Sequence, residues 1–479
     1  MKRYRRTTLI MVAALAVLAG LVAARRVHIE PAAWWLIFAP ALLLLKHKNI
    51  TSLTIVIILG LGIGLWRGGL FMQKLDEIKA LAGQEVTIQA TARSDSIYAR
   101  GSQLEFTAGE VSLLKPTSKP LTGIFRVSGF GEPIVYRGDR VQISGKLYPT
   151  RGANQARISY SKLDKLGPDT SWLNRLTRKF TAGIQSALPE PAASFGLGIL
   201  VGQRNTMPAE INQQLVTVGL VHIVAVSGYN LTILVRAVSR LRLGSKYQKL
   251  VLSLSLIGLF VVITGFSASI VRAAVVSSLG LWAWYYGRQA RPLLVLALAA
   301  AITAYARPFY IWGDVGWYLS FLAFFGILIV APVIVKRLFS KRPKLITLAV
   351  IETLAAEIMT LPLIMLIFGQ LSLVALVANG IIVPLVPVAM LLSAVAGMGG
   401  MLVAPIAGWF AWPAVMLMTF MLDIIRLLAS VPSALVHATI SPVAMLVFYG
   451  FFGLVVLAAT KHLKTKKVLA AAAKTQLTP

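Results

Sequence analysis

Three polar side chains of types that take part in catalysis lie close together in one apolar stretch of the sequence. They are His222, Ser227 and Asn230, which carry a base, a hydroxyl and an amide. A histidine beside a serine is the pair used in nucleophilic hydrolysis, so one hypothesis is an intramembrane serine hydrolase. On a single helix, however, positions 222 and 227 are about 140° apart. The serine would therefore need a histidine from another segment, such as His437.

A second polar side chain, Arg272, lies a few residues inside an apolar run and close to Ser269. A buried guanidinium can hold a phosphate through two parallel hydrogen bonds. Alternatively, the side chain snorkels to the membrane surface or pairs with an acid such as Glu352 or Glu357. The residue types alone do not separate these interpretations.

The other polar residues in apolar runs have simpler expected roles. Asp314 stands near the end of a run, where its carboxylate is expected to cap a helix by accepting from backbone N–H groups. Gln370 and Asn379 are expected to hydrogen-bond across helices. Because polar groups facing lipid cost free energy, we expect such side chains to face the protein interior. The candidates for a polar path are Arg204, His222, Ser227, Asn230, Ser269, Arg272, Asp314, Ser320, Gln370 and Asn379.

Metal and cysteine chemistry find no support in the sequence. The chain has no cysteine, which excludes disulfides, thiolate catalysis and cysteine-based metal sites. Its five histidines are scattered and make no close pair at metal-ligand spacing. The P-loop pattern of nucleotide hydrolases does not occur either. We therefore expect no catalytic residue, no metal ion and no cofactor.

Membrane-spanning helices are the elements predicted to position these side chains. The 479 residues are 57% hydrophobic and only 13% charged. Many apolar runs are long or nearly long enough to cross roughly 30 Å of hydrocarbon. They lie near 9–24, 53–65, 250–266, 313–335, 345–368, 371–396 and 441–459, with further spans expected at 215–235, 269–286, 293–306 and 401–430. The sequence predicts an α-helical integral membrane bundle of about twelve spans.

The net charge of +30 follows the predicted topology. Most of the 47 Lys and Arg residues form clusters between the apolar runs, as the positive-inside rule and contact with anionic lipids require. Binding of a polyanion such as nucleic acid is the alternative explanation. With both termini in the cytoplasm, three spans within 1–83 place residues 67–210 outside. Arg25 and Arg26 are the basic residues that do not follow the positive-inside rule in this topology. Residues 461–479 are then a short basic cytoplasmic tail.

Residues 84–168 are more polar and are predicted to form a separate β-domain outside the membrane. Alternating β-forming runs at 85–93, 103–113, 121–128, 139–147 and 156–163 predict five strands. Five strands of this size fit an OB-type β-barrel. Such barrels bind single strands through basic grooves and stacked rings, for which Phe106, Phe125, Phe130, Tyr136, Tyr148 and Tyr160 are available. We expect most of these rings in the barrel core.

Two further segments connect the β-domain to the remaining spans. Within 169–192, residues 172–188 have the periodicity of an amphipathic helix lying at the outer membrane face. Residues 193–460 form the membrane core, in which a short apolar run followed by polar residues predicts a re-entrant or broken helix near 195–214. The cations expected to receive an anion on the outer side are Arg126, Arg137, Arg140, Lys146, Arg175, Arg178 and Lys179.

Several ordered motifs in the membrane core resemble those of the ComEC-type competence proteins, the channels associated with DNA uptake in natural transformation. The family patterns are similar to residues 268–273, 314–323, 360–362 and 368–379, and its first motif matches Gly202, Arg204, His222, Ala225, Ser227 and Gly228. Together with the barrel, the resemblance covers most of the chain. The sequence departs from the family pattern at Asn230, Ala268 and Tyr318, where histidine, proline and glutamine are common.

The resemblance implies an inner-membrane channel of a bacterium that translocates single-stranded DNA into the cytoplasm. It implies a DNA receptor protein outside, and a cytoplasmic ATPase and DNA-binding proteins inside. A separate nuclease is also implied, because no metallo-β-lactamase-like His-x-His-x-Asp-His run occurs in this chain. A homo-oligomer is compatible with this role. The alternative from the residues alone is a secondary transporter or exporter of a small or anionic solute.

Overall fold

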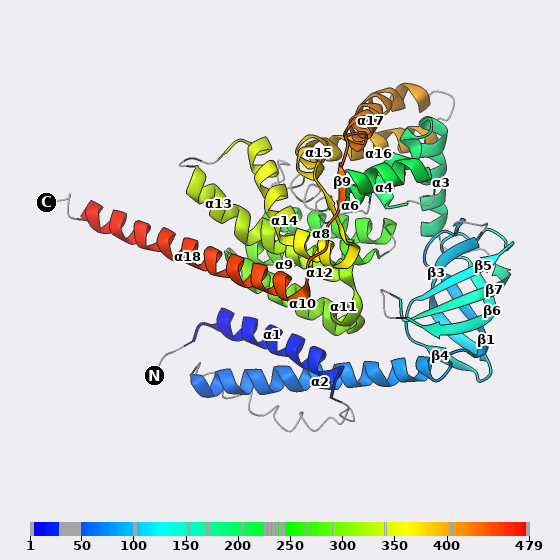
Figure 1. The fold of residues 1–479 in the computed structure, drawn as a ribbon, viewed down its shortest axis with the longest axis horizontal. Coiled ribbons are helices and arrows are strands. Elements are labelled where there is room, and N and C mark those ends of the chain that lie inside the picture. The colour runs from blue at the N-terminus through cyan, green and yellow to red at the C-terminus, as the bar shows by residue number, and fades with distance from the viewer. Residues whose placement is uncertain are drawn as a thin grey trace. The chain divides into compact units, whose positions relative to one another are not determined.

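The computed structural model (Figure 1) contains helices in most of the chain and one sheet domain near the N-terminal end. It describes residues 4–27, 49–98, 103–150, 154–167, 172–203, 206–224, 228, 231, 235, 238, 245–264, 266–289, 291–339, 341, 343–402 and 407–475. The described chain divides into two compact units, which we describe separately. The first comprises Met1–Pro208, Ile223–Tyr318 and Val388–Met418, and the second comprises Ala209–His222, Leu319–Pro387 and Thr419–Pro479.

By length and composition, seven helices in the described ranges could cross a membrane. They are Arg6–Ala24, Ile50–Lys79, Lys246–Ile263, Val315–Leu338, Thr347–Phe368, Ala375–Leu402 and Gly408–Ala429. Shorter apolar helices are Ala192–Val201, Pro292–Ala306 and Pro442–Val456. A multi-pass membrane protein follows from these helices, and the count of about twelve spans stays a prediction. The second expected N-terminal span precedes Lys46 and lies outside the described residues.

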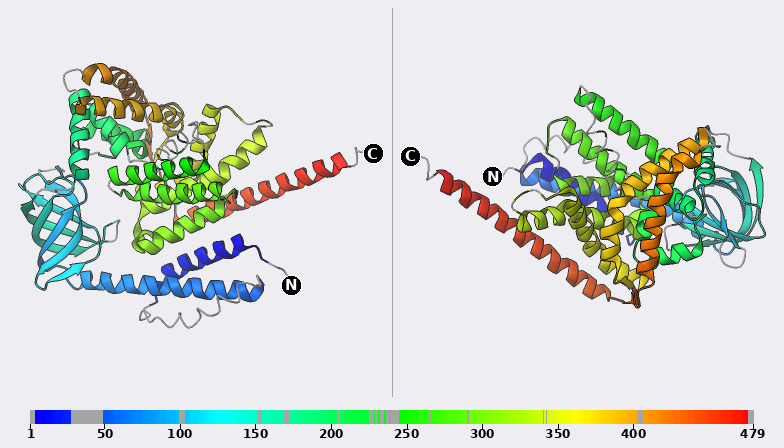
Figure 2. Two further views of the ribbon diagram at one scale, coloured as in Figure 1. Left: turned by 180° about the vertical axis from the view of Figure 1, so that it is seen from behind. Right: turned by 90° about the horizontal axis from the view of Figure 1, so that it is seen from above.

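Two helices at the N-terminus, α1 (Arg6–Ala24) and α2 (Ile50–Lys79), pack with their backbones in close approach. A Cβ added at Gly60 or Gly64 of α2 would lie closer than 3.0 Å to atoms of α1, and one added at Gly20 of α1 would do so against α2. Small residues permit this contact, which drives helix association in membranes. Gly60 faces Ala16 and Gly64 faces Gly20, so the two helices run parallel (Figures 1 and 2).

The β-domain is a sheet that closes on itself. Its strands are β1 (Glu85–Ala92), β2 (Ile97–Tyr98), β3 (Gln103–Lys115), β4 (Lys119–Leu121), β5 (Phe125–Phe130), β6 (Arg140–Pro149) and β7 (Ala156–Gly167). They pair in the order β1-β6-β7-β5-β3, and β3 pairs back to β1. The β5–β7 pair is parallel, whereas the other pairs in this ring are antiparallel. The two views of Figure 2 show the resulting curved sheet.

The core of the β-domain continues into the end of α2. Alternate residues of the strands, such as Val86, Ile88 and Ile143, point inward and are fully buried. Ile78 of α2 belongs to the same hydrophobic cluster, and Leu75 packs against it. One helix, α2, therefore contributes both to the contact with α1 and to the core of the β-domain.

The predicted strands correspond to β1, β3, β5, β6 and β7, with one shift in position. The run predicted at 121–128 divides into β4 and β5, and Gly123 lies between them with φ +142°. A φ in that range is open to glycine but strained for other residues. All three residues of β4 pair with β3, and β5 completes the ring.

The rest of the first unit consists of short and medium helices. They are α3 (Trp172–Ala187), α4 (Ala192–Val201), α8 (Lys246–Ile263), α9 (Ala268–Tyr285), α10 (Pro292–Ala306), α11 (Phe309–Gly313) and parts of α6 (Val221–Val224), α12 (Val315–Phe325), α16 (Val386–Leu402) and α17 (Ala407–Ala429). The bounds of α3 agree to within one residue with those of the amphipathic helix predicted at 172–188. Helix α4 ends at Gly202, whose φ of +79° is left-handed. A re-entrant path near 195–214 stays a prediction.

The second unit is built around α14 (Leu345–Phe368). The π-helix η3 (Gly326–Val330), α13 (Ala331–Leu338), α15 (Ala375–Ile382) and α18 (Pro442–Thr475) contact it. The unit also contains α5 (Ala209–Thr217) and η4 (Val383–Leu385). Its core contains Val330, Ile351, Ala355, Met359 and Val456. Strands β8 (Gln370–Ser372) and β9 (Leu435–His437) pair antiparallel beyond the end of α14.

Replacing Gly64 with leucine should separate α1 from α2, because the new side chain would meet the backbone of α1. We expect a loss of stability of about 1 to 3 kcal/mol, the usual range for overpacking. The matched control is Gly258→Leu in α8, where an added Cβ has nothing within 4 Å. Thermal unfolding of the full chain in detergent would measure the difference. Equal melting temperatures for the two variants would contradict the close α1–α2 contact.

Candidate nucleic-acid interface

Arg272 is a buried cation whose hydrogen-bonding capacity is only partly used. It lies near the start of α9, and only 3% of the residue is exposed. Its Nη2 donates to the carbonyl oxygen of Gly316 at 2.9 Å. Its Nε and Nη1 have no hydrogen-bond partner among the described residues. A guanidinium with free N–H donors in a buried position is suited to bind an anion, because it is already desolvated.

Asp314 is placed beside this guanidinium by the start of α12. As predicted, it caps the helix, since its Oδ1 accepts from the backbone N–H of Trp317 at 3.1 Å. The indole Nε1 of Trp317 donates to Thr303 Oγ1 at 3.1 Å and ties this turn to α10. A Cβ added at Gly316 would lie 3.1 Å from Asp314 Oδ1 and 3.9 Å from Arg272 Nη2. Arg272, Asp314 and Gly316 therefore converge at one point of the first unit.

The remaining path candidates are not all brought to this point. Ser269 lies half-buried near the start of α9. In the second unit, Asn379 of α15 is buried and donates through Nδ2 to Glu357 Oε2 of α14 at 3.5 Å, which is the expected bond across helices. Glu357, which the sequence suggested as a partner of Arg272, thus has an amide partner. Two further candidates of the second unit, Ser320 and Gln370 in β8, are half-buried. His222 belongs to the same unit and is exposed, and its Nδ1 lies 3.2 Å from Gly219 O. Arg204, Ser227 and Asn230 lie outside the described residues.

Three of the seven outer cations have structural partners. Arg126 forms an ion pair with Glu105. Arg137 donates to the carbonyl oxygens of Val262 and Ile263 at 3.3 and 3.2 Å, and so closes the C-terminal end of α8. Arg178 contacts Asp139 Oδ1 at 3.4 Å. These guanidiniums are used to hold the β-domain and its neighbours together. The other four, Arg140, Lys146, Arg175 and Lys179, are exposed.

The outward side of β6 and β7 carries cations and aromatic rings together. We call this surface the β6–β7 face, and it comprises Arg140, Lys146, Tyr148, Arg157, Tyr160 and Lys162, all exposed. Tyr148 pairs with Arg157 across the two strands. The ring of Tyr160 lies 6.5 Å from that of Phe130 on β5, centroid to centroid. Bases of a single strand stack on such rings while cations contact the phosphates.

The expectation that most of the six rings lie in the core is wrong. Phe106 and Phe125 are buried, whereas Phe130, Tyr136, Tyr148 and Tyr160 are between 43% and 75% exposed. At Tyr160 the backbone has φ +55°, and an extra residue of β7 interrupts its pairing with β6. Such a bulge shifts the alternation by one residue. Tyr160 therefore points outward, although strict alternation from Ile158 would have turned it inward.

Sequence reasoning missed three cations of the β-domain. Arg157 and Lys162 occupy outward positions of β7, and Lys165 lies 5.7 Å from the ring centroid of Tyr136. The alternation of charged with apolar residues in 156–163 was the available signal for the first two. Their position beside Lys146 and Tyr148 depends on the β6–β7 register, which the alternation alone does not provide.

Comparison with known proteins supports the resemblance. The family model described as Competence protein matches residues 199–462, more than half of the chain. The chain is similar to ComE operon protein 3 of Bacillus subtilis (strain 168), with 26% identity over 215 residues. That alignment covers 44% of this chain and 27% of the relative, so the chain matches about a quarter of the relative's length. No solved structure matches the chain. All the path candidates lie inside the matched range, and the β-domain lies before it.

Two substitutions at Asp314 should separate the contribution of its capping hydrogen bond from that of its negative charge. Asp314→Asn keeps an oxygen that can accept from the Trp317 N–H, whereas Asp314→Ala removes the acceptor. We expect the alanine variant to be less stable than the asparagine variant by about 1 kcal/mol, the usual value of a helix cap. Thermal unfolding of both purified variants would measure it. If the two variants melt at the same temperature, the cap contributes nothing to this turn.

Proposed function

The chain belongs to the competence protein family, and from that premise we propose that it is an inner-membrane channel that carries single-stranded DNA into the cytoplasm. A strand with one charge per phosphate cannot cross hydrocarbon without a hydrated or cationic path. The observation that carries the proposal is the buried guanidinium of Arg272, two of whose nitrogens lack a partner in the part of the chain that the structure describes. It lies within the range that matches the family.

The β-domain is proposed to receive the strand before it enters the membrane. Its ring of pairings, with one parallel pair between β5 and β7, is consistent with the strand order of an OB-type barrel. The β6–β7 face supplies both components of a sequence-independent single-strand site, which are cations and exposed rings. Arg140, Lys146, Arg157 and Lys162 would contact phosphates there, and Tyr148 and Tyr160 would stack on bases.

The parallel packing of α1 and α2 supports an outward position of the β-domain. Parallel spans enter the membrane from the same side, so the C-terminal end of α2 faces away from the N-terminus. A cytoplasmic N-terminus, which the basic residues before α1 favour, then puts the β-domain outside. In this arrangement the chain acts as a conduit and not as an enzyme. Pulling and strand degradation would come from a cytoplasmic ATPase, DNA-binding proteins and a separate nuclease.

A secondary transporter of an anionic solute is the second candidate function. The same buried Arg272 would suit a carboxylate or phosphate substrate, and α4 is a short apolar helix that stops at a glycine, as the Gly-interrupted segments of transporters do. The β6–β7 face is the feature that this alternative leaves without a role. Experiments that follow DNA directly therefore distinguish the two functions.

Labelled-DNA uptake in a deletion strain tests the channel. We expect Arg272→Ala to reduce DNA entry into the cytoplasm roughly tenfold or more, because a phosphate path loses its buried cation. Arg272→Lys should restore part of the uptake, since it keeps the charge but not the bidentate geometry. Arg288→Ala, beyond the end of α9, is the control that removes an exposed arginine. Normal DNA entry in the deletion strain itself would rule out the channel.

Titration of the full chain with single-stranded DNA at several salt concentrations tests the β6–β7 face. Lys146→Ala combined with Lys162→Ala should weaken binding and reduce the slope of log affinity against log salt by about 1.4, or about 0.7 for each lost phosphate contact. Lys115→Ala combined with Lys119→Ala, on β3 and β4, should leave the slope unchanged. Salt-independent binding by the unmodified protein would show that the β-domain does not receive DNA.

A further inference from the structure

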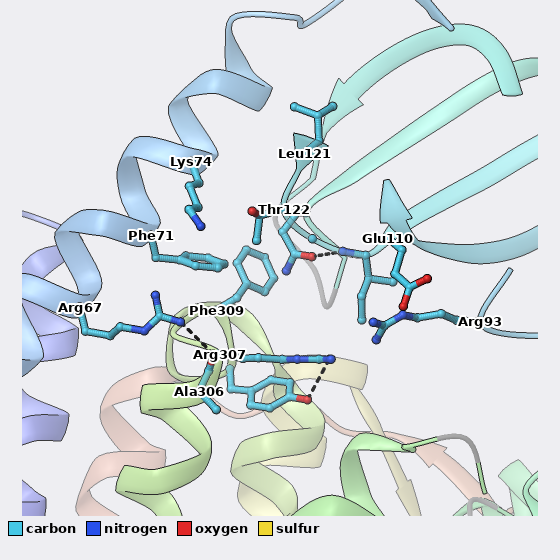
Figure 3. A pocket seen from close by; sticks show the side chains of 14 residues that line it. Arg67, Phe71, Lys74, Arg93, Glu110, Leu121, Thr122, Ala306, Arg307 and Phe309 are labelled. Atoms are coloured by element: carbon cyan, nitrogen blue, oxygen red, sulfur yellow. Dashed lines mark hydrogen bonds between the residues drawn. The ribbon is translucent and has the colours of Figure 1, made fainter. Parts of the chain in front are cut away.

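A cavity of about 360 Å³ lies within the first unit, where α2, the β-domain and the turn between α10 and α11 meet. Figure 3 shows Arg67, Phe71 and Lys74 of α2 directed toward the same space as Arg307 and Phe309 of the turn. Arg93, which follows β1, enters from the side of the β-domain. A cavity of this size is sufficient for a small ligand or a headgroup.

The charges around the cavity are unbalanced. Of the described residues that line it, four are cations and one, Glu110, carries a carboxylate. Glu110 already accepts a hydrogen bond from Thr91 Oγ1 at 3.1 Å. Burial lowers the pKa of Arg93, the neighbouring Arg307 guanidinium lowers it further, and Glu110 opposes both. Two guanidiniums that repel each other across a cavity are stabilised when an anion lies between them.

The cations differ in how far they are engaged by the protein. Arg67 donates through Nε and Nη2 to the carbonyl oxygens of Tyr305 and Ala306 at 3.0 and 3.1 Å, so it closes the end of α10. Arg307 Nη1 lies 3.4 Å from the hydroxyl of Tyr310. Arg93 lies across Gly109 of β3, where a Cβ would collide with its side chain. Arg93, Arg307 and the exposed Lys74 are therefore the groups available to a ligand.

The cavity is placed at the level where apolar helices end. Arg67 is the first charged residue of α2 after Ile50, and α10 contains no charged residue before Arg307. Aromatic side chains gather at the same level, as they do at membrane surfaces. The indole of Trp312 donates to Leu21 O of α1 at 2.8 Å, and its ring centroid lies 5.7 Å from that of Phe71. Arg25 donates to the carbonyl oxygen of Trp312 at 2.9 Å.

We propose that this cavity binds the phosphate of an anionic phospholipid headgroup from the outer leaflet. Arg93 and Arg307 hold the phosphate from two sides, Lys74 contacts it from α2, and Phe71 and Phe309 line the apolar part of the site. Phosphate is the chemistry that paired guanidiniums recognise. The position at the end of α2 and α10 favours a lipid over a free phosphate, because a headgroup is present there at high local concentration. The assignment to the outer leaflet rests on the topology given with the proposed function.

Native mass spectrometry of the detergent-purified full chain tests the site. Phosphatidylglycerol and phosphatidylcholine are added in equal amounts, and the lipid retained by the protein is measured. We expect the unmodified protein to retain phosphatidylglycerol preferentially. Arg93→Gln combined with Arg307→Gln should weaken this retention roughly tenfold, as the loss of charge-assisted hydrogen bonds predicts. Lys74→Gln, at an exposed position that cannot disturb the fold, should weaken it less.

The control variant combines Arg288→Gln with Arg291→Gln. These exposed arginines precede the N-terminal end of α10, whereas the cavity lies at its C-terminal end. It removes the same charge and should keep the preference for phosphatidylglycerol. Equal retention of the two lipids by the unmodified protein would overturn the proposal, as would equal loss in the control. If the Arg93→Gln/Arg307→Gln variant does not unfold cooperatively, its folding is impaired and Lys74→Gln becomes the test. Unchanged retention of phosphatidylglycerol by Lys74→Gln would then overturn the proposal. Complete displacement of the lipid by inorganic phosphate at low concentration would identify a free-phosphate site instead.

Discussion

The approach of the α1 and α2 backbones at Gly20 and Gly64 determines where much of the first unit lies. Because glycine has no Cβ, the two helices contact through their backbones, and their parallel direction follows from that contact. Helix α2 then continues without interruption until Ile78 is buried among the strands. At about 1.5 Å per residue, its 30 residues span about 45 Å. Helix α2 thus takes part both in the contact with α1 and in the core of the β-domain.

Arginines that end helices are a second recurring feature of the first unit. Arg67 donates to the last carbonyls of α10, and Arg137 donates to those of α8. The last carbonyls of a helix lack partners within it and carry a partial negative charge, so a guanidinium satisfies both needs. Part of the positive charge near the β-domain therefore stabilises the fold and is not available for an anionic ligand.

Local features of the structure could be predicted from the sequence, and distant ones could not. The strand positions, helix α3 and the cap at Asp314 follow from alternation, periodicity and residue type over short segments. The structural role of Arg137 depends on α8, more than 100 residues later in the chain. The outward ring of Tyr160 depends on a bulge that no residue type announces. The cavity residues Arg67, Arg93 and Arg307 come from three distant segments, so no spacing in the sequence connects them.

Two nitrogens of Arg272, Nε and Nη1, lack hydrogen-bond partners among the described residues, and this affects the stability of the folded chain. Each buried nitrogen that lacks a hydrogen-bond partner raises the free energy of the folded state, although Nη2 of the same guanidinium is satisfied by Gly316 O. An anion that bound to Arg272 in the folded state would, by mass action, make unfolding less favourable. Under the proposed channel function, the protein would resist heat best while a phosphate occupied Arg272 and least after that phosphate had left.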